Sequence, residues 1–241
     1  MKIVARTDTG LVRDNNQDSY SAFEIENAVV AVVCDGMGGA AEGALASNCA
    51  VKEIKDYITE RFYSGMTDLS IKSLLVSAVE NANRVVYNLS RTDESYFGMG
   101  TTAVVAVVLD SFVYIAHVGD SRAYKKSDGI LNQLTKDHSI IQHMIENGEI
   151  SAEEAVGHPD KNIITRALGV DNSVKVDFCQ ESFDESDILI LCSDGLSNFV
   201  TPDDIVNLTD DGRYFDYADR LVNLANQNGG RDNITVIAVE Y

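Results

Sequence analysis

The sequence has no tryptophan, only two prolines and only four cysteines. No apolar run approaches the ~20 residues that a membrane-spanning helix needs, and the N-terminus MKIVARTDTG lacks the apolar segment of a secretion signal. The cysteines form no CxxC pair and no disulfide framework; they are Cys34, Cys49, Cys179 and Cys192. We therefore expect no membrane association, and a cytoplasmic protein whose thiols are reduced.

Basic residues are also scarce. There are 19 Lys and Arg residues against 38 Asp and Glu residues, a formal net charge of −19. A surface of this sign repels nucleic-acid phosphates, so we expect no nucleic-acid partner. The 45% hydrophobic content is that of an ordinary folded protein, and no linker or repeat interrupts the chain. We expect one domain over residues 1–241, and a monomer.

Hydrophobic patterning predicts about ten strands, two long helices early in the chain and one late. The helices are expected at 42–60, 70–91 and 214–227, and the strands occur mainly as hairpins. Because the order is not a repeated βαβ alternation, it predicts an α+β fold in which helices cover antiparallel sheets.

Four aspartates occur at the ends of apolar strands. Asp35 follows AVVAVVC, Asp120 follows VYIAHVG, Asp194 follows ILILCS, and Asp232 directly precedes NITVIAV. One Asp-Gly pair alone is best explained as an ordinary turn, but four such acids favour a shared site. Hard cations such as Mg²⁺ and Mn²⁺ take oxygen ligands. Asp35 could bridge two ions, the Gly36 carbonyl could add a neutral ligand, and Asp194 and Asp232 could hold one ion together.

Two further patterns leave alternatives open. GMGGAA, at 36–41, fits a dinucleotide-binding fingerprint, but Asp35 would repel a pyrophosphate and no parallel βαβ unit follows. In RDNNQD, at 13–18, Arg13 could bind an oxyanion beside Asp18, which could orient a water bound to a metal. The same turn could equally be a solvated loop, and spacing does not decide between the two readings.

Taken together, the motifs resemble the metal-dependent protein phosphatases, the type-2C Ser/Thr phosphatases, in their compact bacterial form. They are R-x-x-N-Q-D at 13–18, DGMGG at 35–39, GTT at 100–102, GDSR at 119–122, DHS at 137–139, ITRALG at 164–169, SDGL at 193–196 and GGRDNIT at 229–235. The resemblance covers essentially the whole chain. It implies a four-layer αββα sandwich, with two central antiparallel β-sheets flanked by helices.

The resemblance also implies an activity, namely hydrolysis of phosphoserine and phosphothreonine by a water that bridges two Mn²⁺ or Mg²⁺ ions. In this pattern Asp35 bridges both ions, Gly36 offers its carbonyl to the second, and Asp194 and Asp232 ligate the first. The expected partners are phosphorylated proteins and a cognate Ser/Thr kinase.

Other positions take roles by the same resemblance. Arg13 would bind the substrate phosphate, and Asp18 would hold a metal-bound water. Asp120, with Asp194, would bind a third, weaker ion. Residues 140–168 correspond to a flap beside the active site.

The sequence departs from the family pattern after Asp35-Gly36. Met37 stands where many eukaryotic members have a histidine, and Ala40 and Ala44 change the rim of the site. Two alternative functions remain at this stage. One is a phosphatase of the same fold that acts on small phosphoesters or phosphotyrosine, and the other is an inactive interaction domain.

Overall fold

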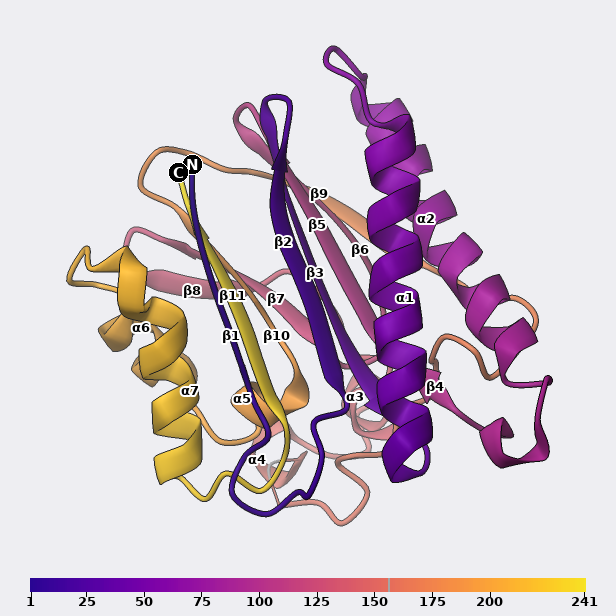
Figure 1. Cartoon of the computed structure of the whole chain (residues 1–241). Coiled ribbons are helices and arrows are strands. Elements are labelled where there is room, and N and C mark those ends of the chain that lie inside the picture. The colour runs from indigo at the N-terminus through magenta and orange to yellow at the C-terminus, as the bar shows by residue number, and fades with distance from the viewer. Residues whose placement is uncertain (156) are drawn as a thin grey trace.

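The computed structural model describes residues 1–155 and 157–241, which form two antiparallel sheets packed face to face between layers of helices (Figure 1). The strands are β1 (Lys2–Asp8), β2 (Asp18–Ile25), β3 (Ala28–Met37), β4 (Gly100–Thr101), β5 (Ala103–Leu109), β6 (Phe112–Val118), β7 (Arg122–Ser127), β8 (Ile130–Gln133), β9 (Asp177–Ser182), β10 (Ile188–Cys192) and β11 (Ile234–Glu240). The helices are α1 (Ala40–Arg61), α2 (Asp68–Leu89), α3 (Ile140–Glu146), α4 (Ala152–Ala155), α5 (Asp194–Ser197), α6 (Pro202–Leu208) and α7 (Tyr217–Gln227), with short 3₁₀ turns η1 (Glu94–Tyr96) and η2 (Tyr214–Asp216).

The two sheets are linked by the segment 9–17. One sheet has the strand order β1-β11-β10-β7-β8, and the other has the order β2-β3-β5-β6-β9 with β4 against β3. Successive strands β2–β3, β5–β6 and β7–β8 pair as antiparallel hairpins. β1 and β2 are neighbours in sequence but belong to different sheets, so segment 9–17 crosses from one sheet to the other at the end where β3 finishes (Figure 1).

Apolar side chains fill three layers, and β3 contributes to two of them because both of its faces are covered. Val29 and Val33 point into the layer between the sheets, whereas Val30 and Cys34 point into the layer beneath α1 and α2. A strand covered on both faces needs apolar residues at successive positions, which is the pattern of this segment. The third layer lies between the other sheet and the helices α5 to α7.

The observed fold confirms the expected α+β class, and the boundaries differ locally for identifiable reasons. β3 continues through Asp35 to Met37 instead of ending at residue 34, because β4 pairs with Gly36 and Met37. α2 begins at Asp68, two residues early, because the Thr67 side chain caps it by accepting a hydrogen bond from the Ser70 amide. Asp35 therefore lies within a strand and not in a turn.

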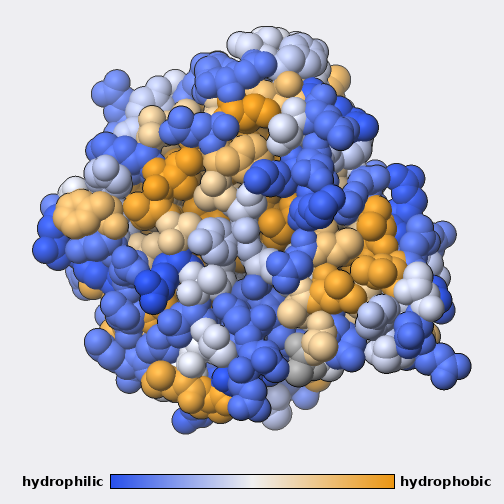
Figure 2. Space-filling model, in the orientation of Figure 1, coloured by the Kyte–Doolittle hydropathy of each residue, from blue (hydrophilic) through white to orange (hydrophobic). Residues whose placement is uncertain are grey.

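On the face drawn in Figure 2, much of the surface is hydrophilic, and apolar side chains gather in patches between the hydrophilic areas. Across residues 1–155 and 157–241, no helix combines the length and the apolarity that crossing a membrane requires.

Candidate active site

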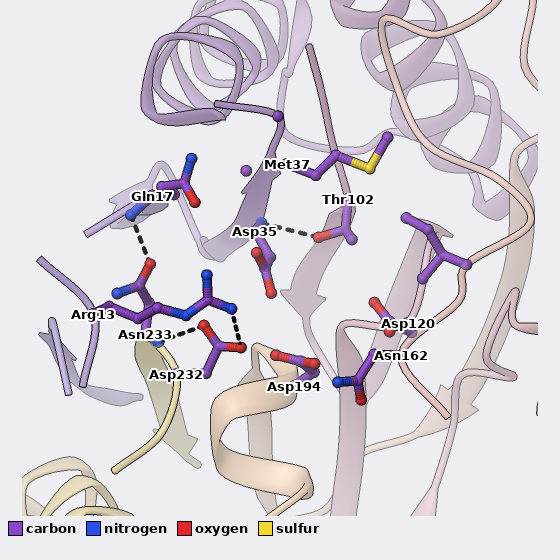
Figure 3. A pocket seen from close by; sticks show the side chains of 13 residues that line it. Arg13, Gln17, Asp35, Met37, Thr102, Asp120, Asn162, Asp194, Asp232 and Asn233 are labelled. Carbon is purple, nitrogen blue, oxygen red and sulfur yellow. Dashed lines mark hydrogen bonds and ion pairs between the residues drawn. The ribbon is translucent and has the colours of Figure 1, made fainter. Parts of the chain in front are cut away.

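The four strand-end aspartates surround one pocket of about 250 Å³. In Figure 3 the carboxylates of Asp35, Asp120, Asp194 and Asp232 lie around a common space. The pocket is lined by Arg13, Gln17, Asp35, Gly36, Met37, Gly38, Thr102, Asp120, Asn162, Ile164, Asp194, Asp232 and Asn233. Residues separated by more than 200 positions in the sequence thus share one cavity.

Asp35 is held in place through its backbone. Its amide donates to Thr102 Oγ1 at 2.9 Å, and its carbonyl accepts from the Thr102 amide at 2.8 Å and from Thr101 Oγ1 at 2.9 Å. The next residue, Gly36, lies so close to α1 that a Cβ atom there would overlap the Gly43 carbonyl. The extension of β3 thus presents the Asp35 carboxylate to the pocket from a fixed backbone.

Asp194 and Asp232 are brought together by the approach of α5 to the start of β11. A Cβ atom on Gly195 would overlap the Asn233 carbonyl, so only glycine allows this approach. The Asp194 carboxylate accepts from Asn198 Nδ2 at 3.0 Å, and the Asp232 carboxylate accepts from the Asn233 amide at 2.9 Å.

Arg13 lies at the exposed rim, where its Nη2 donates to Asp232 Oδ2 at 2.8 Å. The loop that carries Arg13 is fastened by Asn233. Asn233 Nδ2 donates to the carbonyls of Thr9 and Asn15 at 2.9 Å, and Asn233 Oδ1 accepts from the Gln17 amide at 2.8 Å. The sequence alone predicted no role for Asn233, although this residue lies within the GGRDNIT motif.

Asp18 lies behind the pocket and does not line it. It is 7% exposed, pairs in register with Asp35 across β2 and β3, and accepts a 2.7 Å hydrogen bond from Ser193 Oγ at Oδ2. Its other oxygen, Oδ1, is buried and has no hydrogen-bond partner among residues 1–155 and 157–241.

Burial and mutual repulsion raise the pKa values of four of the acids, Asp18, Asp35, Asp120 and Asp194. Burial, and then the neighbouring Asp18 and Asp194, raise the pKa of Asp35 well above its ordinary value. Burial is also the main cause that raises the pKa of Asp18 and of Asp120 to about 7, and of Asp194 to about 6. Such a group of carboxylates, together with an unsatisfied buried oxygen and a backbone carbonyl, fits the all-oxygen ligand set of hard divalent cations.

Comparisons with known proteins place nearly the whole chain in one family. The family model for protein phosphatase 2C matches residues 12–236. The Serine/threonine phosphatase stp of Listeria monocytogenes is 41% identical over 237 residues, which cover 98% of this chain and 94% of that protein. The chain belongs to the protein phosphatase 2C family. The expected enzyme class, a protein phosphatase that hydrolyses phosphomonoesters, is thereby confirmed.

Solved structures of phosphatases share the fold. The S. agalactiae serine/threonine phosphatase matches with a TM-score of 0.93 at 36% identity, covering 99% of this chain and 98% of that one. The catalytic domain of the phosphatase PstP, solved in complex with two manganese ions, matches with a TM-score of 0.87 at 32% identity, covering 98% and 96%. The four-layer sandwich expected from the sequence is confirmed by these matches.

The segment expected to be the flap of this phosphatase, 140–168, contributes Asn162 and Ile164 to the pocket wall. A hydrogen bond of 3.0 Å from the Ile140 amide to the Ile163 carbonyl joins two parts of this segment, and Leu168 binds β4 through hydrogen bonds with the amide and the carbonyl of Thr101. Residue 156, within this segment, lies outside the described residues.

A second group of metal-capable side chains lies beside the site. Ligand atoms of His117, His138 and Asp177 lie within 4.8 Å of one another. Two features do not suit a cation there: the imidazole planes are nearly parallel, at 16°, and Arg166 Nη1 lies 3.0 Å from His138 Nε2. Nearly parallel rings do not aim their lone pairs at one point, and a guanidinium repels a cation. We interpret this group as a hydrogen-bonded cluster.

Proposed function

We propose that this phosphatase hydrolyses phosphoserine and phosphothreonine in proteins, with two divalent cations, Mn²⁺ or Mg²⁺, held by Asp35, the Gly36 carbonyl, Asp194 and Asp232. The convergence of these four residues on one pocket carries the proposal. Asp120, with Asp194, would hold a third ion. When bound, the cations would lower the pKa of a water to near neutrality and stabilise the charge that develops on the phosphoryl group.

Arg13 would bind the phosphoryl oxygens. A guanidinium has five N–H donors, so its bond to Asp232 leaves donors for a phosphate at the rim of the pocket. These donors would stabilise negative charge in the transition state.

Asp18 would orient a water through its buried Oδ1, because its other oxygen is held by Ser193. Met37 lines the pocket but its thioether carries no proton, so it does not protonate the leaving serine or threonine oxygen. The balanced reaction consumes one water and releases the free hydroxyl side chain and inorganic phosphate.

We further infer that residues 1–241 act as one catalytic domain, with 140–168 as its flap. The substrates would be products of a Ser/Thr kinase. We expect a cytoplasmic monomer, in which the buried thiols of Cys34 and Cys192 remain reduced.

Assay of the purified protein with a phosphothreonine peptide tests the proposal. We expect turnover with Mn²⁺, none after EDTA, and little with a phosphotyrosine peptide or a small aryl phosphate. Asp35→Asn and Asp194→Asn should each lower kcat by at least about 100-fold and weaken Mn²⁺ binding measured by calorimetry. Turnover that persists in EDTA would contradict the metal-dependent mechanism. A preference for the aryl phosphate would instead favour a small-molecule phosphatase.

The role of Arg13 has its own test. Arg13→Ala should lower kcat/KM by about 10- to 100-fold, because a charged donor to the phosphoryl group is lost, while Mn²⁺ binding is retained. Arg91→Ala, which removes an arginine of the loop after α2, is the matched control and should match wild type. Unchanged kcat/KM in Arg13→Ala would exclude it as the phosphate ligand.

A further inference from the structure

His138 lies at the centre of the His117, His138, Asp177 and Arg166 cluster and reaches the strand end that carries Asp120. Its side chain is only 5% exposed, and its ring stacks on His117 with a centroid distance of 4.8 Å. The residue is buried, polar and unused by the mechanism proposed above.

Both polar groups of Gly119 bind to His138. The Gly119 amide donates to His138 Nδ1 at 3.0 Å, and the Gly119 carbonyl accepts from the His138 amide at 2.9 Å. Gly119 has a φ of +104°, a conformation that other residues rarely adopt, and glycine has the most backbone freedom to lose on folding. These two bonds therefore fix the peptide planes on either side of a flexible residue directly before Asp120.

The other side of the imidazole is held by Asp177. His138 Nε2 lies 3.2 Å from Asp177 Oδ2, and Asp177 Oδ1 accepts from Arg166 Nη1 at 3.0 Å. Because Nδ1 accepts a hydrogen bond from Gly119, it carries no proton in the neutral ring, so Nε2 carries the proton and donates it to Asp177. Burial lowers the pKa of His138 to about 4, which agrees with a neutral ring.

We propose that His138 is a positioning residue that fixes the Gly119–Asp120 backbone, and that Asp177 acts through it by holding the Nε2–H tautomer. The inference rests on the proposed role of Asp120 as a metal ligand. Supporting residues of this kind orient a ligand, and their loss commonly costs 10- to 100-fold in metal affinity or activity.

Two substitutions at His138 distinguish the effect of losing the hydrogen bond to Nδ1 from the effect of losing the rest of the imidazole ring. His138→Ala removes the acceptor, whereas His138→Asn places an amide oxygen close to the position of Nδ1. We expect His138→Ala to lower kcat by about 10- to 100-fold and to weaken the weakest Mn²⁺ site in calorimetry, with little change in KM. His138→Asn should recover most of both losses. Equal losses in the two variants would overturn the proposal.

Substitutions at Asp177 test the tautomer. Asp177→Asn keeps an oxygen that can accept from Nε2–H, whereas Asp177→Ala lets the proton move to Nδ1, where it would oppose the Gly119 amide. We expect Asp177→Ala to weaken the same Mn²⁺ site and Asp177→Asn to keep it close to wild type. The reverse order would overturn the assignment of the proton to Nε2.

A double-mutant cycle with Asp120→Ala decides whether His138 acts through Asp120. If it does, His138→Ala should change neither kcat nor Mn²⁺ binding further in the Asp120→Ala background. His117→Ala is the matched control: it removes an equally buried histidine without a bond to Gly119, and should lower the unfolding temperature without altering Mn²⁺ binding. Equal effects of His117→Ala and His138→Ala on Mn²⁺ binding would make the role of His138 merely structural.

The same cycle separates this inference from the proposed function. If Asp120→Ala itself leaves Mn²⁺ binding and kcat unchanged, the ligand role of Asp120 fails. If Asp120→Ala lowers both but His138→Ala lowers neither, the ligand role stands and the positioning role of His138 is overturned.

Discussion

Asp18 and Asp35 face each other across paired strands, and two more acids, Asp194 and Asp120, raise the pKa of Asp35 further. Carboxylates at such short range repel one another, and burial weakens the screening by water. A positive charge placed among them would relieve both effects. The same crowding that suits a cation therefore makes the site a source of instability when no cation is bound.

A pH dependence of stability follows from these acids. The pKa is raised to about 7 in Asp18 and Asp120 and to about 6 in Asp194, against about 3.9 in an unfolded chain. The folded state binds these protons more tightly, so the stabilisation is fully present below about pH 4 and is lost as the pH rises through about 6 to 7. We expect the unfolding temperature of the EDTA-treated protein to fall over this interval, measured by calorimetry at constant ionic strength.

Two comparisons control this prediction. Asp18→Asn removes one of the titrating groups and should make the fall shallower, and saturating Mn²⁺ should remove most of it. An unfolding temperature of the metal-free protein that rises between about pH 5 and pH 7 would contradict the assignment of raised pKa values to these carboxyls.

Among the secondary-structure elements, α1 and β3 must approach each other closely for the site to form. Gly36 and Gly43 lie at the contact, where a Cβ atom on Gly36 would overlap the Gly43 carbonyl. We expect Gly36→Ala to lower the free energy of unfolding by about 3 kcal/mol, because the helix must shift away from the strand. The same shift would move the Asp35 and Gly36 backbone and reduce turnover.

Gly157→Ala is the matched control for this substitution. Apart from Gly157 itself and its two chain neighbours, no heavy atom in the part of the chain that the structure describes would lie within 4 Å of a Cβ atom on Gly157, so urea unfolding of this variant should match wild type. A Gly36→Ala protein as stable as Gly157→Ala would show that the contact between α1 and β3 can adapt without cost.

The elements were largely predictable from sequence because local patterns define them. Apolar runs predicted β3, β10 and β11 as buried strands, and helical spacing of apolar residues predicted α2. The contribution of Asn233 was not predictable, since its bond to the Thr9 carbonyl joins residues 224 positions apart and leaves no local pattern. The convergence of the four acids was expected only because each of them stands at the end of an apolar strand in the sequence. Their roles as metal ligands stay predictions.

The net charge of −19 is a property of the whole molecule that bears on its substrates. An acidic surface attracts cationic peptides and repels anionic ones, and salt screens this effect. We expect kcat/KM for a phosphothreonine peptide flanked by lysines to exceed that for one flanked by glutamates by about 10-fold at low salt. The difference should shrink severalfold at about 0.5 M NaCl. A preference for the glutamate peptide would show that local charges at the rim outweigh the overall field.

The pairing of β1 with β11 places the two chain ends side by side, with Lys2 opposite Glu240, at the end of the sandwich away from the pocket (Figure 1). β11 begins two residues after Asp232, which lines the pocket, and runs to this far end over seven residues, or about 23 Å. A short linker could therefore join the two ends, and new ends could be opened in the exposed turn at Asp128-Gly129 between β7 and β8. Such a circular permutant would keep every pocket residue on its original strand or loop. In the protein without this rearrangement, either end of the chain could instead carry an anchor to a solid surface, and the pocket would then face away from that surface.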